Sequence, residues 1–167
     1  MIQTPIRSWQ IRPWALAAAV LLSANSSVSA AETLSDFVKD AKWDDLIGTW
    51  VDAETQGATL TTTYAWRLKD RVIEITTTDG NKESIAWMGV NGKTGDVFHM
   101  GVDGDGASSL GKWIDDDGDA VLELIFTSGD GQEGGFKFRN HFKDSDTMTV
   151  TLELPDPVVI NMVRKSK

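Results

Sequence analysis

Turn dipeptides recur along the chain at nearly even intervals, and this spacing limits the possible folds more than any other feature of the sequence. Asn-Gly and Asp-Gly pairs favour two-residue hairpin turns, because such turns need positive φ at both central positions. Short strands separated by turns this regular are typical of all-β sandwiches and barrels. The dipeptides begin 12, 12, 14 and 13 residues apart, at Asp79-Gly80, Asn91-Gly92, Asp103-Gly104, Asp117-Gly118 and Asp130-Gly131.

The segments between these turns are rich in β-branched and aromatic residues, a composition that favours strands. Residues 147–154 alternate polar and apolar without a break, as expected of a strand with one wet and one dry face. Loops this short force neighbouring strands to pair antiparallel. Ten strands are expected, at residues 47–53, 58–68, 71–78, 83–90, 95–102, 106–114, 119–128, 134–143, 147–154 and 158–164.

Ten consecutive antiparallel strands predict an all-β, up-and-down barrel, because closure leaves no exposed sheet edge. A two-sheet sandwich is the alternative. One short helix is expected near residues 33–46, with Thr33 or Ser35 as its cap and Gly48 at its end, because the apolar residues there form a stripe of helical period.

Length and composition exclude several classes of protein. The 167 residues suit one domain, and the absence of cysteine excludes disulfides, thiolate metal sites and a cysteine nucleophile. The excess of 25 Asp and Glu over 16 Lys and Arg argues against a nucleic-acid partner. The Asp-rich turn at 115–119 lacks the Gly and Glu that a hand-type calcium loop needs at its sixth and twelfth positions. We therefore expect no metal and no cofactor.

The first 30 residues have the order of a secretory signal peptide. Their only charged residues are two arginines, and an apolar stretch of nine residues follows at 14–22. That stretch is too short to span a bilayer, which needs about 20 residues. We expect a signal peptide over 1–30 with cleavage near Ala30, a barrel domain over 31–167, and a periplasmic or secreted protein without a membrane anchor.

The tripeptide Gly48-Thr49-Trp50 opens the first expected strand, just after the helix. A Gly-x-Trp at this place resembles the opening of the calycin group, the lipocalins and fatty-acid-binding proteins. The whole mature chain also resembles uncharacterised lipocalin-like domains of exported bacterial proteins. In the calycin group the tryptophan closes one end of the barrel and a basic residue of the last strand packs across it. The resemblance implies these roles for Gly48, Trp50 and Arg164.

The resemblance does not imply a fatty-acid ligand or catalysis. Fatty-acid-binding proteins carry an Arg-x-Tyr that grips a carboxylate, whereas Arg164-Lys165-Ser166 has no tyrosine. No Gly-x-Ser-x-Gly nucleophile motif is present either. We therefore regard an enzyme as the least favoured function.

Aromatic side chains are the best candidates for lining a cavity, although plain core packing explains them equally well. Arg67 is a further polar group expected near a cavity mouth. A histidine that ligates haem inside the barrel is possible for His99 or His141, but solvent-facing histidines are favoured. The candidate ligand-binding residues are Tyr64, Trp66, Trp87, Trp113, Arg139 and His141.

The expected function is that of an exported, non-catalytic binding protein, monomeric, that holds a small, largely apolar molecule inside its barrel. Burial of apolar ligand surface would drive binding at about 25 cal/mol per Å². The alternatives are a filled structural barrel that binds partners through its acidic surface and, less favoured, a haem-binding barrel. Whether the interior is empty or packed decides between the first two.

Overall fold

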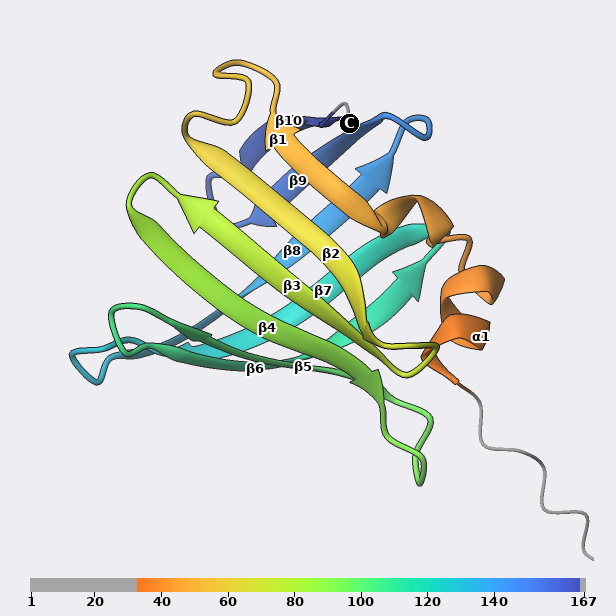
Figure 1. Ribbon diagram of the computed structural model, residues 1–167. Helices are drawn as coiled ribbons and strands as arrows, with labels where there is room; N and C mark the ends of the chain where they lie inside the picture. The colour runs from red at the N-terminus through yellow and green to blue at the C-terminus, as the bar shows by residue number, and fades with distance from the viewer. Residues whose placement is uncertain (1–32, 166–167) are drawn as a thin grey trace, which may run out of the picture.

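The computed structural model describes residues 33–165, and the predicted signal peptide over 1–30 lies outside the described residues. Ten antiparallel strands form one closed barrel, in which each strand pairs with its sequence neighbours and the first strand pairs with the last (Figure 1). The predicted all-β, up-and-down barrel is confirmed. The fold is compatible with the calycin architecture, and the sandwich alternative is excluded.

Each strand begins and ends within two residues of the expected position. Polar and apolar alternation therefore located the strands well. The strands are β1 (Gly48–Asp52), β2 (Leu60–Leu68), β3 (Val72–Asp79), β4 (Lys82–Val90), β5 (Val97–Asp103), β6 (Ser108–Asp116), β7 (Asp119–Thr127), β8 (Glu133–Phe142), β9 (Thr147–Glu153) and β10 (Val158–Arg164).

The turn between β6 and β7 is the clearest case of turn chemistry setting the fold. Asp117 and Gly118 form its two central residues and both have positive φ, 55° and 91°. They lie between Asp116 and Asp119, which pair directly across the hairpin. This is the conformation that Asp-Gly pairs favour, and its twist matches that of the flanking strands.

The predicted short N-terminal helix is confirmed, but it ends at Asp40, short of the expected end near residue 46, and a separate 3₁₀ turn follows. Helix α1 (Leu34–Asp40) begins at Thr33, whose side chain forms a reciprocal capping box with Asp36. Lys42 then adopts a left-handed φ of 60°, which breaks the helix. A 3₁₀ turn, η1 (Asp44–Leu46), follows and leads directly into β1.

The two helices close one end of the barrel (Figure 1). Their apolar side chains Leu34, Trp43 and Leu46 are completely buried. The Trp43 ring meets the Trp113 ring edge-on, with 6.2 Å between the centroids, so the helical plug contacts a side chain that projects inward from β6. The interior is therefore packed at this end.

Trp50 and Arg164 meet where the barrel closes. The two residues are paired across β1 and β10, and the Arg164 guanidinium carbon lies 4.4 Å from the centroid of the Trp50 ring. The indole N–H donates to the Leu46 carbonyl at 3.0 Å, which ties the plug to the first strand. A Cβ on Gly48 would collide with Nη1 of Arg164, so the glycine leaves the guanidinium room.

Candidate functional site

A cavity of about 630 Å³ occupies the half of the barrel away from α1. Its wall is formed by residues of β2 through β10. At the end away from the helical plug its lining includes Asp79, Lys82 and Asp103, which lie at strand ends beside the hairpins. The cavity therefore has a closed floor at the Trp43 end and a mouth among these hairpins. The interior of the barrel is packed in the half next to α1 and open in the half next to the opposite hairpins.

Small residues on β4, β5 and β6 create this space. Ala86 pairs with Gly101, and Gly101 pairs with Ser109, so three small residues lie side by side on the inner face. A Cβ added to Gly101 would lie only 2.6 Å from the Ser109 Oγ atom and 3.1 Å from the Ala86 Cβ atom. Larger side chains at these positions would fill the cavity from this wall.

Aromatic side chains form much of the wall contributed by β7 and β8. The rings of Phe136 and Phe138 meet edge-on with 4.8 Å between their centroids, and Phe126 lies 5.6 Å from Phe136. Phe126 is seated over Gly134, where a Cβ would lie 2.6 Å from the phenyl ring. The apolar lining continues along β7, β9 and β10 with Leu122, Leu124, Val150, Leu152, Ile160 and Met162.

Few polar groups reach into the deeper cavity. His99 is only 7% exposed, and its Nε2 atom lies 3.2 Å from the Ser109 hydroxyl oxygen. Burial lowers the pKa of His99 to about 4, so its imidazole is neutral near pH 7. Burial likewise raises the pKa of the Tyr64 hydroxyl, which stays protonated. The Asn140 amide is already bonded to the Ala120 carbonyl at 2.9 Å.

Charged side chains of the lining are confined to the mouth. The carboxylates of Asp79 and Asp103 lie there with one amine, that of Lys82. The Lys82 amine is engaged with Asp105, at 2.7 Å from the carboxylate oxygen. The mouth is therefore acidic, and the depth of the cavity carries no charged side chain.

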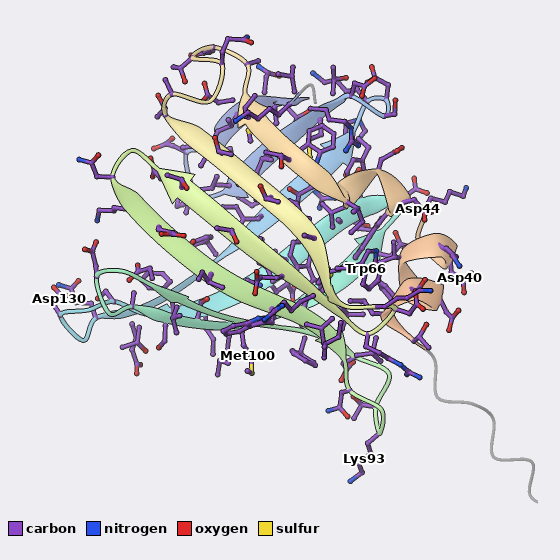
Figure 2. All side chains as sticks on the ribbon, viewed as in Figure 1. Asp40, Asp44, Trp66, Lys93, Met100 and Asp130 are labelled. Atoms are coloured by element: carbon purple, nitrogen blue, oxygen red, sulfur yellow. The ribbon has the colours of Figure 1, made fainter. Side chains whose placement is uncertain are left out.

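Three of the six candidate residues face the interior. Tyr64 and Trp113 are buried and line the cavity. Trp66 lies on the same face of β2 as Tyr64 but closer to α1, and it packs against the buried core without lining the cavity (Figure 2).

The other three candidates, Trp87, Arg139 and His141, lie on the outer face, so the expectation that they line the cavity or its mouth is corrected. On β8, Phe136, Phe138 and Asn140 point inward, so alternation sends Arg139 and His141 outward. Arg139 donates to Glu153 at 2.7 Å and to Asp116 at 2.8 Å.

The remaining outer-face candidates have similarly local surroundings. His141 Nδ1 lies 2.7 Å from Asp119 with its side chain 57% exposed. Trp87 pairs with Glu74 and Met100 on the outside of β3 and β5. Arg67 is also outside, with its Nε atom 3.7 Å from Glu74.

The expectation that His99 faces solvent is wrong, because its side chain is buried. It lies on the inner face of β5, paired with the inward Met88. The sequence pattern did not identify its neighbours Gly101 and Ser109 as residues of the site. The signal that identifies them is an inward row of small residues, which is visible only after the strand register is known.

An apolar row crosses the outer surface of β5, β6 and β7. Met100, Leu110 and Ile125 are paired in register across these strands and are 46%, 55% and 64% exposed. Figure 2 shows Met100 pointing away from the barrel. A shallow groove beside this row is bordered by the ion pair of Lys137 and Glu123.

The Asp-rich turns are explained by their own backbone. Asp103 Oδ1 accepts from the amides of Asp105 and Ala107, at 2.9 and 2.8 Å, which leaves this carboxylate occupied in shaping its turn. Within residues 33–165, no group of three or more His, Asp or Glu side chains is placed to hold a metal ion. No helix in the same range is long and apolar enough to cross a membrane.

Comparisons with known proteins give no identification. No family model matches the chain, and no curated protein matches it significantly.

Proposed function

We propose that this protein is an exported, non-catalytic carrier that holds one small, largely apolar molecule in its barrel. The observation that carries the proposal is the cavity of about 630 Å³, closed at one end and lined mostly by apolar side chains. Sites for small ligands commonly enclose about 300–1,000 Å³ and combine apolar walls with a few polar groups. The deep cavity has this composition.

The shape of the cavity also favours binding over a purely structural role. A barrel of this size that served only as a scaffold would gain stability from larger inward side chains, because filling a cavity restores packing contacts. Ala86, Gly101 and Ser109 instead stand together in one wall and keep it open. The filled structural barrel is therefore the less supported alternative.

The chemistry of the lining supports a carrier more than an enzyme. General acid–base catalysis needs titratable groups placed to exchange protons with a substrate. His99 has a hydroxyl, that of Ser109, as its hydrogen-bond partner and no carboxylate. The charged groups of the lining stand at the mouth.

Export is proposed from the residues of the leader alone. Two basic residues, a short apolar stretch and small residues before Ala30 form the order that secretion machinery recognises. A mature protein that begins near residue 31 when isolated from the periplasm or medium would support this part of the proposal. An exported protein that begins at Met1 would refute it.

Tryptophan fluorescence tests the carrier function directly, because Trp113 lines the cavity and contacts Trp43 at its floor. Titration with the uncharged dye N-phenyl-1-naphthylamine should give saturable quenching of tryptophan emission together with a rise in dye emission. The variant Trp113→Phe should keep the dye signal and lose part of the quenching. A linear, non-saturable response in the wild-type protein would refute the proposal.

Haem is the one specific alternative ligand that the fold leaves open, because His99 faces the cavity. An absorbance scan of protein purified from its own cell distinguishes the two. A Soret band that disappears in His99→Leu would favour haem over an apolar guest.

A further inference from the structure

His99 and Ser109 form a polar pair within the mostly apolar cavity wall. Nε2 of His99 lies 3.2 Å from Oγ of Ser109. Nδ1 of His99 is buried and has no hydrogen-bond partner within residues 33–165. The bond to Nε2 uses only part of the donor and acceptor capacity of the Ser109 hydroxyl, so a guest group that offers a hydrogen bond can join this pair.

Gly101 leaves this pair uncovered on the cavity side. It lies between the two residues on the inner face, and it lines the cavity as they do. A Cβ at this position would lie 2.6 Å from the Ser109 hydroxyl oxygen and 3.2 Å from Nε2 of His99. The missing side chain therefore gives a guest molecule room to approach both polar atoms.

The distribution of charge disfavours an anionic guest. The imidazole of His99 is neutral near pH 7, since burial lowers its pKa to about 4, and it offers no positive charge to a carboxylate. At the mouth an anion would meet the carboxylates of Asp79 and Asp103. The nearby amine of Lys82 is already paired with Asp105.

The wall formed by β7 and β8 favours flat rings. The perpendicular arrangement of Phe136 and Phe138, with 4.8 Å between centroids, presents both a ring face and a ring edge. Aromatic guests stack on such faces and edges with a gain beyond the area they bury. Phe126 extends this aromatic surface toward the mouth.

We propose that the cavity selects an uncharged, largely apolar ring compound with one hydroxyl or carbonyl group, which hydrogen-bonds to the pair formed by His99 and Ser109. This inference rests on the proposed carrier function and names the chemical class of its ligand. The ring body lies against Phe126, Phe136 and Phe138, and the polar group points to β5 and β6.

Three probes with one ring system test this selection: pyrene, 1-pyrenemethanol and 1-pyrenecarboxylate. Each is titrated at pH 7 by energy transfer from tryptophan to pyrene. The alcohol should bind about 3- to 10-fold more tightly than the hydrocarbon, the range that one net hydrogen bond supplies. The carboxylate should bind at least about tenfold more weakly than the alcohol, because its charge is buried without a partner.

Variants at position 99 separate the hydrogen bond from the general fit. In His99→Leu the alcohol should bind no more tightly than pyrene, while the affinity for pyrene stays within about twofold of wild type. The conservative His99→Gln, which keeps a donor and an acceptor, should retain a preference for the alcohol. Ser109→Ala, a smaller change on β6, should weaken alcohol binding without affecting pyrene.

The outcomes distinguish the two proposals. Binding of pyrene with no preference for the alcohol, or a carboxylate that binds as tightly as the alcohol, would overturn the ligand class and leave the carrier function standing. An alcohol preference that persists in both His99→Leu and Ser109→Ala would overturn the assigned hydrogen bond. Failure of all three probes to bind the wild-type protein would overturn both proposals.

Discussion

Replacing Arg164 with alanine should weaken the barrel at the place where it closes. The guanidinium donates to three backbone carbonyls, those of Asp45 at 2.7 Å, Ile47 at 2.8 Å and Ser145 at 2.7 Å. These bonds join the last strand to the 3₁₀ turn, to the start of β1 and to the loop after β8. The same group covers the Trp50 ring at 4.4 Å.

The size of the effect follows from these contacts. A hydrogen bond to a charged donor contributes about 1.5–3 kcal/mol and a cation–π contact about 0.5–2 kcal/mol. These contributions do not add, because the four contacts share one side chain, and water partly replaces them since the side chain is 25% exposed. We expect Arg164→Ala to lower the free energy of unfolding by about 3–5 kcal/mol.

Urea unfolding followed by tryptophan fluorescence measures this change. Arg164→Lys keeps the charge over Trp50 but loses the planar fork, and should show an intermediate loss of about 2 kcal/mol. Arg67→Ala is the matched control, because the Arg67 side chain is 69% exposed and its guanidinium forms one long ion pair within residues 33–165, with Glu74 at 3.7 Å. This change should cost less than about 1 kcal/mol. A loss in Arg164→Ala no larger than in this control would refute the reasoning.

Three further predictions concern the cavity and one turn. The pKa of about 4 for His99 lies below its unfolded value of about 6.5, so the unfolded chain takes up the proton first and stability falls by up to about 3 kcal/mol between pH 6.5 and 4. Urea midpoints compared at pH 7 and pH 4.5 should show this loss shrinking in His99→Leu, and an unchanged pH dependence would contradict it. Gly101→Val should abolish dye binding while far-ultraviolet circular dichroism stays that of a β protein, because its side chain would press against Ser109; retained binding would show that the guest lies elsewhere. Gly118→Ala should cost about 1 kcal/mol from its φ of 91° alone, whereas Gly92→Ala, which has ordinary φ and equally open surroundings, should be nearly neutral in thermal unfolding.

The barrel could be predicted from sequence because its signals are local. The turn dipeptides and the alternation in residues 147–154 act over a few residues. Asp117-Gly118 is the one of the five dipeptides in which both residues have positive φ, so the regular spacing located the hairpins better than the expected turn type did. The closing contact of Trp50 with Arg164 joins residues far apart in sequence. Only the resemblance to the calycin group suggested it, since no local pattern connects the two positions.

The helical segment shows where local signals were insufficient. The apolar stripe runs on past Ala41, but the chain must turn there to bring Trp43 into the barrel. Lys42 takes a left-handed conformation to make that turn, although lysine has no preference for it. Tertiary packing therefore overrides the helical period at this point.

The candidate site was predicted only in part, because the size of a side chain does not indicate whether it faces the interior or the outside of a hollow barrel. Trp87 is larger than its neighbours Ala86 and Met88, yet it lies outside while they lie inside. On β8 the pattern was sufficient: once Phe136 and Phe138 face inward, Arg139 must face outward. Small inward residues mark the cavity, and an expectation built on aromatic residues overlooks them.

The helical plug closes one end of the barrel, so in the proposed carrier a guest would enter and leave through the mouth among the opposite hairpins. The part of the guest that lies deepest in the cavity would enter first and leave last. A guest longer than the cavity is deep keeps its tail in solvent among the hairpins opposite α1.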